Sequence, residues 1–175
     1  MTQTPITTTL AKIREFSPCE DGYKKLCKNL GGVRKYGKDT PVKFSQIVES
    51  NGLDDAVWCL QTICPEYEKE VRLFAADCAE SVLHIYEKKY PDDLRPREAI
   101  QAARDFAEGK ITAAELTSAS WAADRASFSA AACDAWDAFA VARASARASA
   151  SWAAWAAARK PEREKQKKML IERFG

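Results

Sequence analysis

The residues best suited to chemistry are two arginines at the expected start of one helix. The run Asp93-Leu94-Arg95-Pro96-Arg97 sets both guanidinium groups at the first turn, where unpaired backbone N–H groups already favour anions. The planar fork of arginine binds a phosphate or a carboxylate with two hydrogen bonds. The motif therefore predicts an anion-binding site in which Asp93 orients one arginine or caps the amides. The alternative is an internal salt bridge between Asp93 and Arg97 that only fixes the loop.

A second candidate is a stripe of aromatic and arginine side chains in the alanine-rich segment that follows. At about 100° per residue, four aromatic residues share one side of a helix and three arginines lie beside them. They are Trp121, Phe128, Trp136 and Phe139, with Arg125, Arg143 and Arg147. Aromatic rings stack on bases and cations neutralise phosphates, so the stripe suits a nucleotide. The alternative is that the rings are core anchors with arginine stems along their edge.

A hairpin between the two candidates would bring them onto one surface. The residues that we predict to bind a ligand there are Asp93, Arg95, Arg97, Trp121, Arg125, Phe128, Trp136 and Arg143.

Signatures of catalysis and of metal binding are missing from the sequence. His84 is the only histidine, Cys-x-x-Cys does not occur, and Gly31-Gly32 lacks the Lys-Ser/Thr of a phosphate-binding loop. We therefore expect no catalytic residue, no metal, no cofactor and no enzymatic activity. The six cysteines, several of them on apolar helix faces, are expected to be buried reduced thiols.

Composition narrows the class of partner. Lys and Arg together number 27 against 25 Asp and Glu in 175 residues, a formal net charge of +2, which makes nucleic acid an improbable partner. The N-terminus has no apolar signal-peptide region, and Asp and Arg interrupt the alanine-rich tract, so we expect no membrane association. These observations predict a cytoplasmic protein, located in the host cytoplasm if it is encoded by a phage.

Proline, glycine and capping residues punctuate an all-α chain without strands. Ser17-Pro18-Cys19-Glu20 is expected to cap one helix, and Thr40-Pro41 to start the next, which closes at Asn51-Gly52. Pro96 begins a helix that stops at Gly109, and Thr112 and Glu115 form a capping box for the one after it. The predicted fold is a compact bundle of short antiparallel helix pairs, followed by a long alanine-rich helix and a basic C-terminal helix.

Four segments follow from this pattern. They are an N-terminal arm (1–16), a helical-pair domain (17–110), an alanine- and tryptophan-rich segment that packs on it (111–160) and a basic amphipathic tail (161–175). Alanine fills 22 of the 49 positions from Thr112 to Lys160. Trp152 and Trp155 fall nearly opposite the aromatic stripe, so this segment is either one helix between two partners or a helix broken near 145–151, which we favour.

The run from Tyr90 to Thr112, with its Asp-x-Arg-Pro-Arg-x-Ala-Ile pattern, resembles a family of putative immunity proteins of bacterial polymorphic toxin systems. The blocks 17–23 and 49–60 are similar to uncharacterised alanine-rich proteins of tailed phages. Together the resemblances imply a small helical protein on the conflict side of phage–bacterium biology, with no established activity.

Three hypotheses of function follow. The first is a non-catalytic, phage-related counter-defence protein that sequesters a nucleotide-derived immune signal bearing phosphates. The second is an immunity or inhibitor protein that occludes a toxin or a host defence protein by direct contact. The third is a helical homo-oligomeric scaffold built on close packing of alanine-rich helices.

Overall fold

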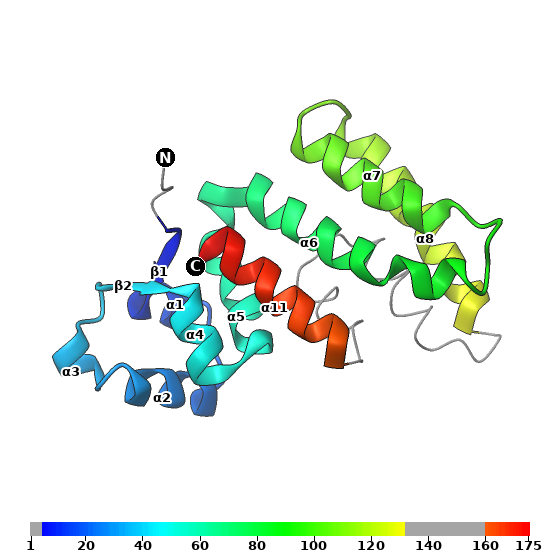
Figure 1. The fold of residues 1–175 in the computed structure, drawn as a ribbon. Coiled ribbons are helices and arrows are strands. Elements are labelled where there is room, and N and C mark those ends of the chain that lie inside the picture. Colours follow the sequence, from blue (N-terminus) through cyan, green and yellow to red (C-terminus); the bar gives the residue numbers. More distant parts are fainter. Residues whose placement is uncertain (1–4, 132–159) are drawn as a thin grey trace. The chain divides into compact units, whose positions relative to one another are not determined.

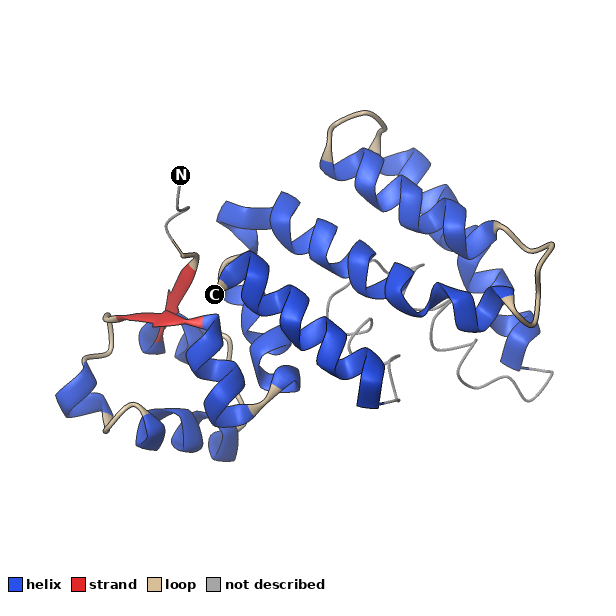
Figure 2. Ribbon diagram, in the orientation of Figure 1, coloured by secondary structure: helices blue, strands red, loops and turns tan. Residues whose placement is uncertain are grey.

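The protein is predominantly α-helical, as the sequence predicts (Figures 1 and 2). The computed structural model describes residues 5–131 and 160–175. Contacts divide the chain into two units: an N-terminal unit, Met1–Tyr67 with Lys167–Gly175, and a central unit, Glu68–Gln166.

The N-terminal unit contains short elements that follow one another closely. In chain order they are β1 (Thr7–Thr9), α1 (Leu10–Glu15), α2 (Glu20–Asn29), α3 (Val33–Tyr36), β2 (Pro41–Lys43), α4 (Phe44–Asn51), α5 (Leu53–Cys59) and a 3₁₀ turn, η1 (Leu60–Thr62), and the last turns of α11 (Lys160–Phe174) also belong to this unit.

A two-stranded sheet corrects the expectation that the chain has no strands. β1 and β2 pair antiparallel with Thr8 opposite Val42, and both of these side chains are buried. Pro41 therefore starts a strand, and α4 begins three residues later than predicted, at Phe44. Strands of three residues are too short to produce a legible alternation of polar and apolar side chains.

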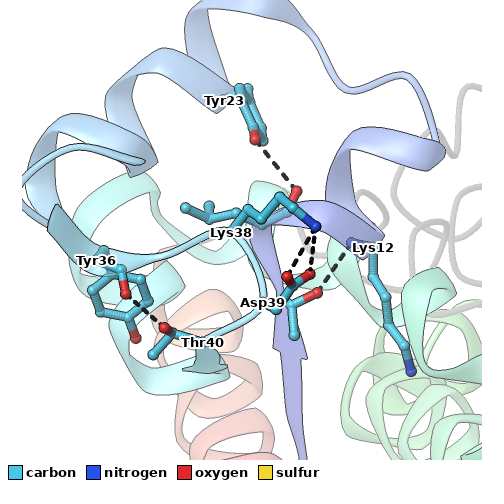
Figure 3. A network of polar contacts seen from close by, with 8 residues as sticks. Lys12, Tyr23, Tyr36, Lys38, Asp39 and Thr40 are labelled. Atoms are coloured by element: carbon cyan, nitrogen blue, oxygen red, sulfur yellow. Dashed lines mark hydrogen bonds and ion pairs between the residues drawn. The ribbon is translucent and has the colours of Figure 1, made fainter. Parts of the chain in front are cut away.

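The loop before β2 is closed by local hydrogen bonds. The Thr40 hydroxyl donates to the Tyr36 carbonyl (Figure 3), and the Tyr36 hydroxyl donates to the Pro41 carbonyl at 2.7 Å. Nearby, the Tyr23 hydroxyl reaches the Leu10 carbonyl at 3.3 Å and ties α2 to α1. These hydrogen bonds fix the position of α2 against α1 and of α3 against the start of β2.

The start of α2 also differs from the prediction. Ser17 adopts a left-handed conformation, with φ of 52°, and the helix is capped instead by Cys19, whose Sγ accepts the Gly22 N–H at 3.3 Å. The end of α2 agrees with the prediction, because Gly31 and Gly32 take φ values of 87° and 91° that favour glycine.

Aromatic packing links α4 to the C-terminal helix inside the N-terminal unit. Phe44 and Phe174 are fully buried, and their ring centroids lie 5.7 Å apart. Leu170, one turn before Phe174, is also fully buried. The predicted amphipathic tail thus forms a helix whose last turns belong to the core of this unit.

Among its described residues, the central unit contains α6 (Cys64–Glu87), which begins in the N-terminal unit and loses helical geometry at Tyr67, then α7 (Arg95–Ala107), α8 (Ala113–Ala131) and the first turns of α11. Alanines let these helices approach closely: Ala76 and Ala79 of α6 cluster with Ala103 of α7, and Leu116 of α8 packs against that cluster. Further along, Ala123 of α8 packs on Ala99 of α7.

The predicted boundaries of α7 and the predicted start of α8 are confirmed. Pro96 lies in the first turn of α7, and Gly109 ends the helix region with φ of 72°. The Thr112 N–H donates to Glu115 at 2.7 Å, and the Glu115 N–H donates to the Thr112 hydroxyl at 3.3 Å, which completes the predicted capping box. The predicted break near 145–151 lies outside the described residues.

The described cysteines agree in part with the expectation of buried thiols. Cys27, Cys59 and Cys78 are buried, whereas Cys19 is exposed at the start of α2. Burial raises the pKa of the Cys59 thiol to about 12, so this residue stays protonated and packs as an apolar side chain.

Candidate functional site

The first arginine of the predicted anion site is already bound by a carboxylate of the protein. Asp93 accepts two hydrogen bonds from the Arg95 guanidinium, at 2.8 Å from Nε and 2.6 Å from Nη2. The Arg95 backbone N–H donates to the same carboxylate at 3.2 Å. This is the bidentate geometry that an anionic ligand would need, and Asp93 supplies it from within the chain.

The second arginine is paired as well. The Arg97 guanidinium binds Glu87 at the end of α6, with distances of 2.8 Å from Nε and 2.6 Å from Nη2. Both guanidinium groups of the motif therefore have carboxylate partners within the protein. An internal salt bridge forms in the motif, as the alternative held, but Asp93 pairs with Arg95 rather than with Arg97.

A third arginine extends this arrangement along the seam between α6 and α7. Arg104 Nη2 lies 2.8 Å from Asp77 and 2.5 Å from Glu80, both on α6. Asp77, Glu80 and Glu87 recur at helical spacing on one side of α6, opposite Arg97 and Arg104 on α7. The contact with Arg104 lowers the pKa of Glu80. These pairs hold the two helices in register.

A buried tyrosine completes the motif. Tyr86 is 1% exposed, and its hydroxyl donates to Asp93 Oδ2 at 2.6 Å. Burial and the neighbouring carboxylate raise the pKa of Tyr86. Asp93 thus joins the end of α6, the following loop and the start of α7, which explains structurally why an aspartate precedes Arg-Pro-Arg.

The ionisation of Asp93 makes stability depend on pH. Hydrogen bonds from Arg95, and then from Tyr86, lower the pKa of Asp93 from 3.8 to about 2. A lowered pKa in the folded state stabilises the protein above pH 3.8, and this contribution is lost as the pH falls towards 2. We expect Asp93→Asn to remove a pH-dependent contribution of about 1 kcal/mol, after allowance for solvent screening.

Urea unfolding measured between pH 2 and pH 6 checks this expectation. Asp92→Asn is the matched control, since Asp92 is the exposed neighbour in the same loop. The assignment fails if the stability of Asp93→Asn varies with pH as steeply as that of the Asp92→Asn control.

The surface around the motif is an open hollow of mixed charge. Lys89 and Arg95 line it together with Asp92, Asp93 and Glu98. Carboxylates thus outnumber cations among these charged residues, so the charge of this hollow does not support the binding of an anion.

The aromatic–arginine stripe is described only at its beginning. Trp121 lies on α8 with 63% of its surface exposed, and Arg125, one turn later, is also exposed. Phe128 lies in the last described turns of α8, whereas Trp136 and Arg143 lie outside the described residues. Binding of a ligand by the eight predicted residues stays a prediction.

Several residues that matter here had no place in the sequence-based site. Arg97 is held by Glu87, and Arg104 is held by Asp77 and Glu80. Asp93 is held in part by the hydroxyl of Tyr86. The spacing of the acidic residues on one side of α6 was a usable signal, because it predicts a charged stripe that α7 can meet.

Within the described residues, no helix is long and apolar enough to span a bilayer. The same residues contain no cluster of three or more side chains suited to holding a metal ion.

Comparison with known proteins gives one match. The family model described as Imm-5 like putative immunity protein matches residues 61–175. A search of curated proteins and a search of solved structures found no match. The matched stretch contains the ion-paired seam, Trp121 and the C-terminal helix, and it covers well over half of the chain. The protein therefore belongs to the Imm-5 like putative immunity protein family.

Proposed function

We propose that this chain is an immunity protein that neutralises a toxin protein by direct contact through the outer face of α8. Membership of an immunity family implies a protein partner such as a toxin and suggests a non-catalytic role. The observation that carries the choice of surface is Trp121, which leaves 63% of a large aromatic side chain in solvent. Tryptophan is the residue type most often found at the energetic centre of protein interfaces.

The outer face of α8 is the set of exposed residues at helical spacing around this tryptophan. Its members are Ala114, Thr117, Ser118, Trp121 and Arg125. The opposite side of the helix is occupied, because Leu116 and Ala123 pack within the central unit. Helix α8 is therefore anchored on one side and presents its outer face from a fixed backbone.

The chemistry of this face suits a protein partner. Ala114, Thr117 and Ser118 are small, so the backbone of a partner can approach closely on either side of the Trp121 ring. An exposed tryptophan that lies one turn from an exposed arginine combines the two residue types most enriched at interface centres. Binding there would cover the active site of the toxin without any reaction by the immunity protein.

Paired variants test this proposal. The chain is used to capture proteins from cells of its source organism, and each captured protein is then expressed alone in a test bacterium. We expect one captured protein to be toxic, and co-expression of the chain to restore growth. Trp121→Ala should weaken the affinity by about thirtyfold, corresponding to the loss of one interface hot spot, and should abolish rescue.

Leu94→Ala is the matched control, since Leu94 is another large apolar residue of the central unit, 52% exposed, outside the outer face of α8. Circular dichroism establishes that both variants fold. The proposal fails if Trp121→Ala neutralises the toxin as well as Leu94→Ala does. It also fails if no captured protein is toxic.

Sequestration of a nucleotide signal is the alternative function. It is less well supported, because Arg95 and Arg97, which would bind the phosphates, are paired with carboxylates of the protein. Calorimetry against cyclic and linear dinucleotides and ADP-ribose derivatives distinguishes it. A saturable signal that is lost in Arg97→Ala would favour sequestration by the predicted ligand-binding residues over the toxin-binding face.

A further inference from the structure

The N-terminal unit contains a cavity that the proposed toxin contact does not use. Its volume is about 260 Å³, and every residue that lines it lies between Ile13 and Cys59. The family match begins only at residue 61. A ligand in this cavity would therefore be held by the part of the chain that precedes the family-matched region.

The walls of the cavity are mainly apolar. Ile13, Leu26 and Ile47 contribute buried aliphatic side chains. Tyr23 and Trp58 also line it, and both of these aromatic side chains are half-buried. The cavity thus offers aliphatic and aromatic surface to the faces of a ring.

Polar groups that line the cavity bond to one another or to nearby groups of the protein. The Asn51 amide nitrogen donates to the Gly22 carbonyl at 2.8 Å and to Asp55 Oδ2 at 2.6 Å. The oxygen of the same amide accepts a hydrogen bond from the Ser50 hydroxyl at 2.5 Å. The Gly22 N–H donates to Cys19 Sγ at 3.3 Å. These groups therefore need no ligand to complete their hydrogen bonds.

Other polar side chains of the lining are engaged too. The Tyr23 hydroxyl donates to the Leu10 carbonyl at 3.3 Å, and Asp54 has an interaction of its own within the protein. Burial raises the pKa of the Cys59 thiol to about 12, so this side chain is neutral. A charged ligand would lose water on entering the cavity and would meet polar groups that already have partners. The cavity therefore favours a neutral ligand.

We infer that this cavity binds a neutral aromatic molecule about the size of two fused rings, with one face of the ligand against Trp58. An apolar cavity of about 150 Å³ is sufficient to hold benzene. The present cavity, at about 260 Å³, is large enough to accept a second fused ring. Affinity comes from removing the ring surface from water and from aromatic contact with the Trp58 indole.

Calorimetry on the full chain with three probes tests the size and the charge of the ligand. Indole supplies the neutral ring, tryptamine adds an ammonium group, and indole-3-propionate adds a carboxylate. We expect indole to bind one site per chain with a Kd below about 1 mM. Tryptamine should bind no more tightly than indole, because the carboxylates of Asp54 and Asp55 already have partners. Indole-3-propionate should bind about tenfold more weakly than indole, because its carboxylate would lie near these two aspartates.

A matched pair of variants assigns the binding to the cavity. Leu26→Phe places a larger side chain in the lining, so it should fill part of the space and weaken indole binding by about tenfold. Leu30→Phe is the control, since Leu30 lies one turn later, is half-buried and is not among the lining residues. It should bind indole as the unaltered chain does. Circular dichroism establishes that both variants fold.

A second measurement locates the ligand without any substitution. Cys19 lines the cavity and is exposed, so iodoacetamide can reach its thiol. Saturating indole should slow the alkylation of Cys19 several-fold, because the bound ring covers this side of the cavity. Cys64 is the internal control, since it is partly exposed and lies outside the lining. Its alkylation, followed in the same sample by peptide mass spectrometry, should proceed at the same rate with and without indole.

The absence of saturable indole binding by the folded chain would overturn the inference. Tighter binding of tryptamine than of indole, by about the tenfold that a charge-assisted hydrogen bond contributes, would overturn the neutral class of ligand. Indole binding that leaves the alkylation of Cys19 unchanged, or that is equal in folded Leu26→Phe and Leu30→Phe, would overturn the location. None of these results bears on rescue from a toxin, so this inference and the proposed function succeed or fail separately.

Discussion

Replacing Phe174 by alanine should destabilise the N-terminal unit by about 3–5 kcal/mol, the usual range for deleting a buried phenylalanine ring. Phe174 is fully buried one residue before the end of the chain, and its ring lies 5.7 Å from that of Phe44. Truncation removes this contact and leaves a cavity against α4. Urea unfolding followed by circular dichroism measures the loss.

The control for Phe174→Ala is Ile171→Ala, at the same end of α11. Ile171 is 36% exposed, so its truncation should cost less than about 1 kcal/mol. Similar losses for the two variants would contradict the burial of Phe174 and with it the contribution of α11 to this unit.

Replacing Asp93 by alanine should destabilise the central unit by about 2–4 kcal/mol, because it removes the acceptor of a buried hydroxyl and the partner of a cation together. Tyr86 is 1% exposed, and its hydroxyl would lose the acceptor at 2.6 Å. The Arg95 guanidinium would lose both of its hydrogen bonds to the carboxylate. Thermal and urea unfolding of the variant measure the change.

A double-mutant cycle separates these two losses. Tyr86→Phe removes the hydroxyl that needs an acceptor, so Asp93→Ala should cost less in the Tyr86→Phe background than in the unaltered chain. Asp92→Ala, in the exposed neighbouring position, should change stability by less than about 0.5 kcal/mol. Strict additivity of Tyr86→Phe and Asp93→Ala would show that the hydrogen bond contributes nothing to stability.

The sequence predicts helix boundaries well where backbone chemistry decides them. Pro96, Gly109 and the pair Thr112 and Glu115 act within one turn of the chain, and the structure confirms each of them. The predicted start of α2 was wrong because Cys19, and not Ser17, caps the helix. Serine is a preferred capping residue and cysteine is not, so the sequence pointed to Ser17.

The partners of the arginines were harder to predict. Whether Arg97 meets Asp93 or Glu87 depends on how the end of α6 and the start of α7 approach one another, and this follows from alanine packing across the hairpin. The exposure of Trp121 has the same origin. Alanine on every side of α8 leaves little apolar pattern to reveal which face is covered, so ring spacing alone does not distinguish a core anchor from a surface residue.

The N-terminal unit has a discontinuous sequence, because Met1–Tyr67 and Lys167–Gly175 share one core while Glu68–Gln166 is inserted between them. The family-matched region, residues 61–175, therefore does not coincide with either of the two units. A fragment that begins at residue 61 would keep Leu170 and Phe174 but lose side chains that cover them. It would therefore expose apolar surface that promotes aggregation. Exchange of such domains between related proteins would have to carry both ends of the chain together.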